Sequence, residues 1–301
     1  MNFKTELENR ILYLEENLKR YLPEEAGYSR TVREAMNYSL LAGGKRIRPM
    51  LMFEVYQLFQ GTSELIYPFM AAIEMIHTYS LVHDDLPSMD NDLYRRGKKT
   101  THAVFGEGMA VLAGDGLLNY AFETVLKAKI DTDEMGICLC SLNVLAKKAG
   151  IDGMIGGQTA DILAENIGDS VDLEHLLFIH KNKTAALIEA SMMIGAILAG
   201  ATDDEVNKME QIANKIGIAF QIQDDILDIT STLEVLGKET GSDDKNNKVT
   251  YVTLNGLENS KLQVKKLSDE GIDILKSIET HNGYNNLFLN ELLCSMIARE
   301  K

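Results

Sequence analysis

Apolar side chains recur at spacings of three and four residues along most of the chain. In the first segment Leu7, Ile11, Leu14, Leu18 and Leu22 form one such stripe. This spacing places apolar side chains on a single face of an α-helix. No segment alternates convincingly between apolar and polar residues with the period of two that a half-buried β-strand requires. Similar stripes predict helices over residues 31–41, 65–83, 109–127, 135–149, 174–200 and 204–229.

The distribution of proline also favours long helices. Prolines lie only at positions 23, 49, 68 and 87, and none follows. A proline inside a helix removes a backbone hydrogen bond and clashes with the preceding turn, so a long stretch without proline suits long helices. No internal repeat and no Pro/Ser-rich linker divides the sequence. We therefore predict an all-α protein that folds as a single domain over residues 1–301, a bundle of long helices.

Residues 237–248 differ from the rest of the chain because they contain no apolar side chain. A segment with nothing to bury is predicted to form an exposed polar loop. On its own, such a loop is an ordinary solvated connection between helices. Its place shortly after an acidic motif, described below, gives it a second interpretation as part of a functional site.

The overall charge excludes one class of partner. The chain of 301 residues carries 30 Lys and Arg against 45 Asp and Glu, a formal net charge of −15. A protein that binds a nucleic acid backbone needs a basic stripe, so nucleic acid is not an expected partner. The three cysteines, at 138, 140 and 294, form neither a disulfide framework nor a zinc-binding spacing. A reducing, cytoplasmic location is the expectation.

No segment has the pattern of a stable membrane anchor. The first residues contain no apolar signal core. The most apolar stretch, residues 185–201, is short for a membrane span and is interrupted by Glu189 and Ser191. We predict that this stretch is a buried helix.

Two acidic clusters fall where the periodicity predicts core-forming helices. In the second cluster Gln221, Asp224, Asp225 and Asp228 share one face of a helix whose other positions are mostly apolar. Neighbouring carboxylates repel each other, and burial would strengthen that repulsion. The face therefore either looks into water or is neutralised by a cation. Carboxylates without His or Cys suit Mg²⁺, which also shares oxygen ligands with phosphate groups.

The first acidic cluster is interrupted by Pro87. His77, Ser80 and Asp84 lie on one face of the preceding helix. On a straight helix Asp90 would point away from Asp84, but Pro87 is expected to break the helix. Asp84 and Asp90 could then reach the same metal ion.

Cationic side chains lie on either side of the first cluster. Arg95 and Arg96 come directly after it, and guanidinium groups can grip phosphate oxygens in bidentate fashion. The segment 43–49, Gly-Gly-Lys-Arg-Ile-Arg-Pro, puts three cations beside glycines whose backbone can approach an anion closely. Ordinary salt bridges and a helix C-terminus explain the same residues without a ligand.

Two shorter elements complete the pattern. Residues 156–161 place Gln158 and Asp161 one turn apart, on a helix predicted to begin near two glycines. Residues 180–184, His-Lys-Asn-Lys-Thr, put cations and a hydroxyl before a long apolar helix. Taken alone, each of these two elements is more typical of a purely structural role than of a functional site.

Taken together and in this order, the motifs resemble those of trans-prenyltransferases, the polyprenyl diphosphate synthase family. The similarity runs from about residue 40 to the C-terminus and is most specific in residues 74–90 and 220–228. The resemblance implies an all-helical fold in which the two acidic motifs face each other across a deep central cavity, and it implies a homodimer. It also implies Mg²⁺ as cofactor, with isopentenyl diphosphate and an allylic diphosphate as substrates.

The resemblance implies a role for each motif residue. The Mg²⁺ ligands would be Asp84, Asp90 and, from the opposite wall, Asp224, supported by Asp85, Asp225 and Asp228. Isopentenyl diphosphate would be held by Lys45, Arg48, His77 and Arg96. The allylic diphosphate would contact Arg95, Lys183 and Lys238, with Lys248 as a further candidate, while Thr184 and Gln221 would lie near the reacting carbons. Because it carries Lys238, the loop 237–248 would act as a lid.

The implied reaction is a Mg²⁺-dependent, head-to-tail condensation of isopentenyl diphosphate with dimethylallyl or geranyl diphosphate through an allylic carbocation. Tyr79 and Ser80 lie one turn before Asp84, where a bulky side chain limits the length of the growing chain in this family. This pair, together with the extra residues Pro87 and Ser88, resembles bacterial short-chain farnesyl diphosphate synthases, so farnesyl diphosphate is the expected product. The alternatives are a geranylgeranyl or geranyl product, a class I terpene cyclase, and a non-catalytic regulatory subunit.

Overall fold

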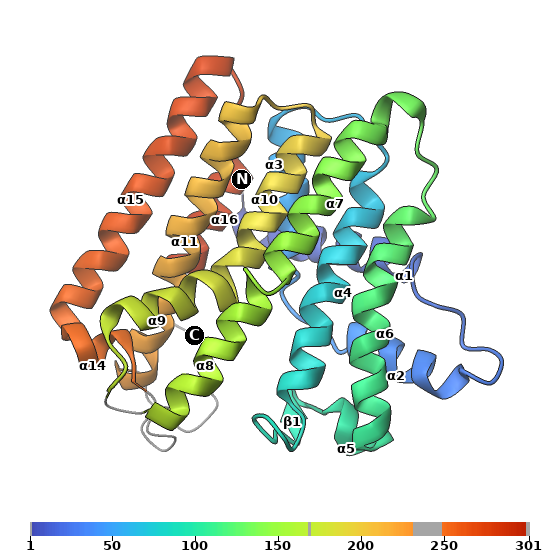
Figure 1. Ribbon diagram of the computed structural model, residues 1–301. Coiled ribbons are helices and arrows are strands. Elements are labelled where there is room, and N and C mark those ends of the chain that lie inside the picture. The colour runs from blue at the N-terminus through green and yellow to red at the C-terminus, as the bar shows by residue number, and fades with distance from the viewer. Residues whose placement is uncertain (1, 168–169, 231–248, 299–301) are drawn as a thin grey trace. The chain divides into compact units, whose positions relative to one another are not determined.

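The computed structural model describes residues 2–167, 170–230 and 249–298, and almost all of its regular structure is helical (Figure 1). The all-α class predicted from the periodicity is confirmed. In chain order the elements, including the 3₁₀-helix η1 and the π-helix η3, are α1 (Phe3–Lys19), α2 (Arg30–Leu40), α3 (Ile47–Leu58), α4 (Ile66–Asp84), β1 (Tyr94–Arg95), β2 (Lys98–Lys99), α5 (Thr101–Phe105), α6 (Glu107–Leu126), η1 (Thr132–Glu134), α7 (Met135–Ala149), α8 (Met154–Ile167), α9 (Leu173–Ile179), η3 (His180–Ala185), α10 (Ala186–Leu198), α11 (Asp203–Thr230), α14 (Tyr251–Asn255), α15 (Leu257–Asn282) and α16 (Leu287–Ile297).

The helix boundaries follow the apolar stripes closely. The stripes over 65–83, 109–127 and 204–229 correspond to α4, α6 and α11. The stripe over 174–200 is divided, because the π-helix η3 separates α9 from α10. The buried helix expected around residues 185–201 is α10, and nearly all of its side chains are buried.

The chain divides into two compact units, and the boundaries between them fall inside α3, between α3 and α4, and inside α7. The first unit comprises Met1–Phe53 and Thr62–Leu142, and the second comprises Glu54–Gly61 and Asn143–Lys301. Each unit contains part of the predicted site. A single domain over residues 1–301, and a central cavity between the two acidic motifs, stay predictions.

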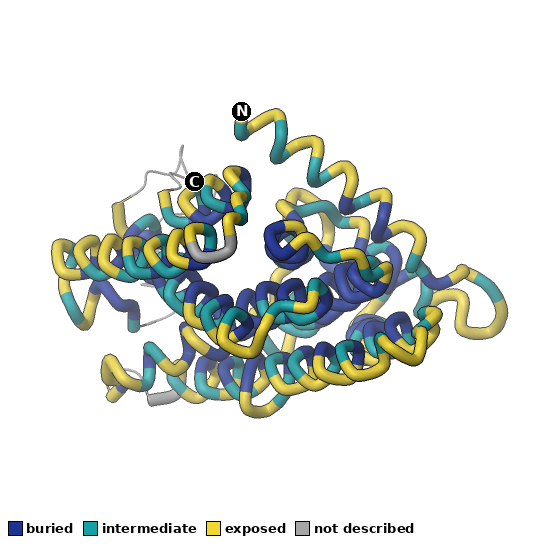
Figure 2. Tube along the Cα trace, turned by 90° about the horizontal axis from the view of Figure 1, so that it is seen from above, coloured by how far each residue is buried: buried dark blue, intermediate teal, exposed yellow. Residues whose placement is uncertain are grey.

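In the first unit α4 is the most deeply buried helix. Most of its side chains between Ile66 and Val82 are buried, as expected for a helix that is apolar on every side. It packs along α6 and also contacts α1 and α2 (Figure 1). By contrast, α1 buries only Leu14, Asn17 and Leu18, and Figure 2 shows exposed residues along much of its length. The remaining polar side chains of α4 gather near its C-terminal end, where the first acidic cluster begins.

A short β-hairpin follows the first acidic cluster, and the apolar pattern did not predict it. Strands β1 and β2 pair antiparallel, with Arg95 opposite Lys98. Between them Arg96 and Gly97 both have positive φ, +53° and +76°. Two central residues with positive φ are the pattern of a type I′ turn, whose twist matches that of the flanking strands.

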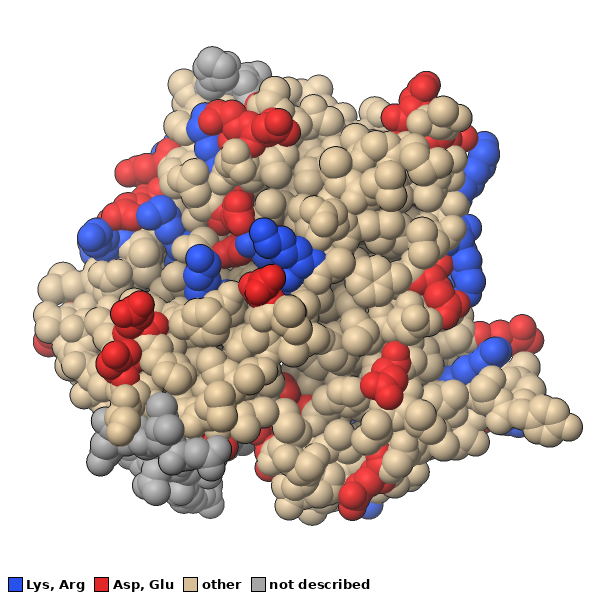
Figure 3. Space-filling model, in the orientation of Figure 1, with Lys and Arg blue, Asp and Glu red and all other residues tan. Residues whose placement is uncertain are grey.

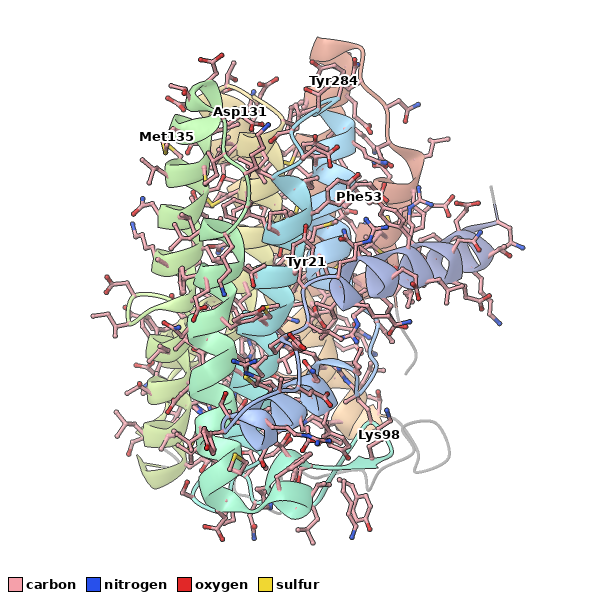
Figure 4. The ribbon with its side chains drawn as sticks, turned by 90° about the vertical axis from the view of Figure 1, so that its right-hand side faces the viewer. Tyr21, Phe53, Lys98, Asp131, Met135 and Tyr284 are labelled. Carbon is pink, nitrogen blue, oxygen red and sulfur yellow. The ribbon has the colours of Figure 1, made fainter. Side chains whose placement is uncertain are left out.

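Hydrogen bonds fix this hairpin to the end of α2. The Tyr38 hydroxyl donates to the Lys99 carbonyl at 2.7 Å. The ammonium of Lys98, which Figure 4 labels, donates to the Leu41 carbonyl at 3.2 Å. The position of the hairpin is therefore set by residues far away in the sequence.

In the second unit α10 and α11 lie side by side, and α11 also packs along α15 (Figure 1). A buried ionic network joins α7, α10 and α11. The Lys148 ammonium donates to Glu189 and also to Glu210, the latter at 2.6 Å, and the Asn214 amide donates to Glu189 at 2.8 Å. Glu189, the acid that interrupts the most apolar stretch, is thus neutralised inside the core, as a buried charge requires.

Acidic and basic side chains are interspersed on the face shown in Figure 3, and no basic stripe crosses that face. Within the described ranges, no helix combines the length and the apolar character that a membrane crossing requires. Cys138, Cys140 and Cys294 carry free thiols.

The π-helix η3 approaches α8 at a position where a side chain would not fit. A Cβ atom on Gly157 would lie 2.6 Å from the carbonyl carbon of Asn182 and 2.7 Å from Lys183 Cα. These neighbours are backbone atoms, which cannot swing aside as a flexible side chain can. Gly157 therefore allows α8 to pack directly against the segment that carries Lys183.

We expect Gly157→Ala to destabilise the protein by about 1–3 kcal/mol, because backbone must shift to admit the methyl group. The matched control is Gly136→Ala, because a Cβ on Gly136 in α7 meets no atom within 4 Å. Alanine favours a helix over glycine by about 0.5–1 kcal/mol, so the control should be neutral or stabilised. Urea unfolding of both variants measures the difference. Equal free energies of unfolding would show that the close approach at Gly157 is unimportant.

Candidate active site

The helix that leads into the first acidic cluster ends at Asp84, the last residue of α4. Pro87 lacks the N–H group that would continue the helical hydrogen bonds. The chain then turns back, so that the Asp90 N–H donates to the Asp84 carbonyl at 2.8 Å. Asp84 is partly buried and Asp90 is exposed. The predicted break is confirmed, and it brings the backbones of these two aspartates together.

Asp85 has different surroundings from Asp84. It is only 3% exposed, and Arg95 Nε donates to its Oδ1 at 2.7 Å while Arg95 Nη2 lies 2.5 Å from the same oxygen. Burial raises the pKa of Asp85, and the hydrogen bond from Arg95 opposes that rise. Arg95 Nη2 also lies 3.6 Å from Asp92. Arg95 is thus held by protein carboxylates, and its contact with an allylic diphosphate stays a prediction.

A buried ion pair supports the basic segment 43–49. Arg46 Nη1 donates to Glu74 of α4 at 2.6 Å, and Arg46 Nη2 donates to the Leu40 carbonyl at 2.7 Å. Both charged side chains are almost fully buried. This arginine therefore anchors the segment to α4, and the binding of a diphosphate by Lys45 and Arg48 stays a prediction.

Gly44 provides the space for one of the predicted substrate-binding cations. Arg96 Nη1 donates to the Gly43 carbonyl. A Cβ on Gly44, where φ is +134°, would lie 2.5 Å from this Nη1 atom. The guanidinium of Arg96, carried by the hairpin turn, thus lies against the glycine segment, and its binding of isopentenyl diphosphate stays a prediction.

Arg48 and His77 are both affected by the positive charge of Arg96. Arg48 Nε is buried and has no hydrogen-bond partner within the described part of the chain, and burial lowers the pKa of Arg48 to about 10. Burial also holds the pKa of His77 well below its usual value, and the charges of Arg48 and Arg96 lower it further. His77 is therefore neutral near pH 7. Lys45 is exposed. All four residues predicted to hold isopentenyl diphosphate belong to the first unit, and their shared role stays a prediction.

The second acidic cluster lies near the C-terminal end of α11, as predicted. The Gln221 amide donates to Asp224 Oδ2 at 3.3 Å. Asp224 is partly buried and Asp228, one turn later, is buried. All four residues of the predicted face, with Asp225 as the fourth, lie on the one helix that the periodicity predicted.

Asp225 faces other parts of the second unit. Its Oδ2 accepts a hydrogen bond from the Tyr251 N–H at 2.7 Å, at the start of α14. The same oxygen lies 3.8 Å from His180 Nε2, at the start of η3. Asp225 therefore connects three elements, a role that the sequence did not predict.

Lys183 belongs to the π-helix and pairs with α8. Its ammonium donates to Asp161 Oδ2 at 2.5 Å, and Thr184 follows it, partly buried. Single π-helical turns often occur at functional sites, because they rotate side chains away from regular helical positions. Two motifs that the sequence showed separately, 156–161 and 180–184, are thus joined by one ion pair.

The donor chemistry of both acidic clusters fits Mg²⁺. Among the described residues, no three carboxylate, imidazole or thiol groups form a ready metal cluster. Mg²⁺ does not require one, because it keeps several waters and takes one or two carboxylates together with substrate phosphates. The residues that would hold it are Asp84 and Asp90 in the first unit and Asp224 in the second. That the two sets share the same ions stays a prediction.

Tyr79, the predicted limit on product length, is buried in α4. Its hydroxyl has no hydrogen-bond partner among the described residues, and burial, followed by the nearby Asp84, raises the pKa of Tyr79 to about 12. The ring of His83 meets it edge-on, with ring centroids 5.9 Å apart. Ser80, by contrast, donates to the His77 carbonyl within its own helix at 2.9 Å. Tyr79 thus contributes bulk rather than hydrogen bonding.

Three predictions lie outside the described residues: Lys238, Lys248 and the lid role of the loop 237–248. The sequence analysis also missed two ion pairs. It did not predict that Arg46 pairs with Glu74 or that Lys183 pairs with Asp161. Helical periodicity carries no information about which distant residues meet. Residue type could have indicated the first pair, because an acidic residue within the apolar helix α4 needs a buried partner for its charge.

Comparison with known proteins bears on these motifs. Residues 29–279 match the sequence profile of the polyprenyl synthetase family. A chloroplastic geranylgeranyl pyrophosphate synthase of Catharanthus roseus is 48% identical over 248 residues, which are 82% of this chain and 69% of that protein. A farnesyl diphosphate synthase of Geobacillus stearothermophilus is 46% identical over 248 residues, which are 82% of each chain. Similar relatives thus bear names with different product lengths.

Solved structures show the same fold. An FPP/GFPP synthase of Zymomonas mobilis, in its apo form, gives a TM-score of 0.83 at 34% identity and covers 99% of this chain and 98% of its own. A geranyltransferase from Helicobacter pylori, complexed with magnesium and isoprenyl diphosphate, gives a TM-score of 0.81 at 33% identity and covers 99% of this chain and 97% of its own.

We expect the neutral His77 to make folding sensitive to acid. Its folded pKa is lowered, so below the usual value of 6.5 the unfolded chain binds a proton that the folded chain does not. Stability should therefore be full above pH 6.5 and fall as the pH drops, by about 1.4 kcal/mol for each unit of pKa difference. Denaturant unfolding between pH 7 and pH 5 should show a weaker acid dependence for His77→Gln than for the parent. His175→Gln controls for the loss of a histidine elsewhere, and identical slopes for the parent and His77→Gln would contradict this expectation.

Proposed function

The chain belongs to the polyprenyl synthetase family, and we propose that it is a farnesyl diphosphate synthase. In the proposed reaction isopentenyl diphosphate condenses head to tail first with dimethylallyl diphosphate and then with geranyl diphosphate, and each step releases diphosphate. One observation carries the proposal: in the first unit Asp84 ends the helix that carries His77, and the chain turns so that the Asp90 N–H meets the Asp84 carbonyl. The charges of Arg48 and Arg96 act on the same His77. Such a site suits two diphosphates, one bound through metal and one bound by cations directly.

Mg²⁺, when bound by Asp84, Asp90 and Asp224, would supply positive charge to the allylic diphosphate. Arg95 and Lys183 would donate to the same diphosphate and stabilise the negative charge that develops as the allylic C–O bond breaks. Thr184 and Gln221 would lie beside the resulting allylic cation. The double bond of isopentenyl diphosphate attacks that cation and forms the new C–C bond. A proton then leaves the adjacent carbon for the released diphosphate, so no nucleophilic side chain is required.

The cationic group of the first unit suits isopentenyl diphosphate, which must stay intact during the reaction. Arg48 and Arg96 remain charged at neutral pH and offer several N–H donors in a fixed plane. The neutral His77 can donate a hydrogen bond without adding charge that the arginines would repel. Lys45, which is exposed, would add a further positive charge.

We further propose that the protein is a homodimer and that it works in the cytoplasm. One face of α6 leaves apolar side chains at least partly accessible in the single chain: Val111, Leu112, Leu118, Phe122 and Leu126. Leu112 is 54% exposed and Leu126 is 64% exposed, and a second copy of the chain would cover such a stripe. Sedimentation velocity tests the assembly, and a monomer at micromolar concentration would contradict it. The free thiols support a reducing compartment.

The purified full chain tests the proposed function directly. With isopentenyl diphosphate, geranyl diphosphate and Mg²⁺ it should release diphosphate and form a C15 product, and EDTA should abolish both. Incubation with farnesyl diphosphate alone distinguishes a terpene cyclase, because only a cyclase consumes that compound without isopentenyl diphosphate. Absence of product under all conditions would favour the non-catalytic subunit.

We expect Tyr79→Ala to lengthen the product to C20 or beyond, because it removes the buried ring that would limit the growing chain. The matched control is Tyr79→Phe, which keeps the ring and should still give C15. Since the hydroxyl has no partner, Tyr79→Phe should also change the free energy of unfolding by no more than about 1 kcal/mol. Chromatography of the dephosphorylated products measures chain length. An unchanged product from Tyr79→Ala would exclude this residue as the limit.

A further inference from the structure

Helix α1 buries only three side chains, and one of them is polar. Leu14, Asn17 and Leu18 lie on one face of this helix, at spacings of three and four residues. An apolar side chain at position 17 would continue the stripe that the two leucines form. Asn17 is instead 5% exposed, and neither polar atom of its side-chain amide has a hydrogen-bond partner among the described residues. A buried amide is costly unless a polar group bonds to it.

Asn17 lines a small cavity of the first unit together with Arg46 and Glu74. Arg46 Nε is buried and likewise has no hydrogen-bond partner within the part of the chain that the structure describes. The cavity has a volume of about 10 Å³, which is enough for one water molecule. A water molecule both donates and accepts, so it can bond to the Arg46 N–H and to the amide of Asn17 at once.

The backbone of Arg46 makes firm support of its side chain necessary. Its φ is +50°, and a residue with a Cβ atom keeps such a conformation only where its surroundings hold it. The guanidinium already bonds to Glu74 and to the Leu40 carbonyl, and Nη2 lies 3.5 Å from Glu15 of α1. A water molecule at Nε would complete this set of partners. Helix α1 would then hold Arg46 at two points, through Glu15 directly and through Asn17 by way of water.

The position of Arg46 matters because its neighbours carry cations of the proposed site. Lys45 precedes it and Arg48 follows two residues later. The Arg46 carbonyl also accepts from the Met50 N–H at 3.1 Å, in the first turn of α3. A displacement of Arg46 would therefore reach the whole segment 43–49. Helix α1 ends before residue 29, where the match to the family profile begins, so that match does not describe this contact.

We propose that Asn17 is a positioning residue, which holds Arg46 through one buried water molecule and so fixes the basic segment 43–49. An asparagine suits this task, because its amide offers a donor and an acceptor without a charge that would compete with Glu74 for the guanidinium. The inference rests on the proposed function where it connects the segment with isopentenyl diphosphate. The water site itself depends on no activity.

A high-resolution crystal structure of the full chain tests the water site directly. It should show one water molecule within about 3.2 Å of both Arg46 Nε and the side-chain amide of Asn17. In Asn17→Leu, which has a side chain of similar size without a polar atom, this water molecule should be lost. A parent structure with no water molecule between the two side chains would overturn the proposal.

Steady-state kinetics test the positioning role. Asn17→Leu should raise the KM for isopentenyl diphosphate by about 3- to 30-fold, because Arg46 Nε loses its link to α1. The kcat and the KM for geranyl diphosphate should stay within about twofold of the parent, since the residues proposed to bind that substrate lie outside the segment 43–49. A change that merely weakened the fold would lower turnover and would not single out one substrate.

Three further variants sharpen the comparison. Asn17→Ser keeps a group that donates and accepts, and it leaves room for a second water molecule, so its KM should stay within about twofold of the parent. Asn9→Leu makes the same change as Asn17→Leu at an exposed position of α1, and it should alter neither KM. If Asn17→Leu does not fold, Asn17→Ala takes its place and should raise the KM for isopentenyl diphosphate above that of Asn17→Ser.

The outcomes separate this inference from the proposed function. If the parent forms no prenyl product, the proposed function fails, while the crystal structure still decides whether water joins Asn17 to Arg46. If the parent is active but Asn17→Leu leaves the KM for isopentenyl diphosphate unchanged, Asn17 does not position the segment and the proposal is overturned. An equal rise in this KM for Asn9→Leu would overturn it as well.

Discussion

A charged side chain beside an apolar core needs a partner, and this requirement organises both units. Arg46 meets Glu74, Lys148 meets Glu189, and Lys183 meets Asp161, each with at least one member buried. Removal of one partner would leave the other as an uncompensated buried charge, which costs far more than the pair contributes. These pairs therefore fix the helices that carry them at defined positions. Charges that hold these helices together are thus paired within each unit.

Much of this arrangement could be predicted from the sequence, because helical periodicity is a local signal. The apolar stripes gave the positions of α4, α6 and α11 to within a few residues. The same periodicity placed Gln221, Asp224, Asp225 and Asp228 on one face of α11. The steric effect of Pro87 is equally local, and it explains why the chain turns so that Asp90 meets the Asp84 backbone. Residue type then indicated the chemistry, since carboxylates and arginines in this order suit metal and diphosphate.

The rest depends on contacts between residues far apart in the chain, about which periodicity is silent. The π-helix η3 continues an apolar stripe that reads as one regular helix, and it is accommodated because Gly157 lets α8 come close. The hairpin contains too few residues to show an alternating pattern. The distinct surroundings of Asp85 and Asp225 follow from Arg95 and Tyr251, neither of which is distinguished by its spacing. The fold class was thus predictable, while the distant partners of Asp85 and Asp225 were not.

The positive φ of Arg96 affects which substitutions would stabilise the protein at this position. A residue with a Cβ atom is strained at positive φ by roughly 1–2 kcal/mol, and glycine, asparagine or aspartate would relieve that strain. None of these three carries a positive charge. Selection for higher thermal stability, in the laboratory or in nature, would therefore favour one of these three residues in place of Arg96. The guanidinium at this position would then be lost. The local strain at Arg96 is in this way tied to a guanidinium that we propose to bind isopentenyl diphosphate, and a substitution that relieves the strain would also remove that group.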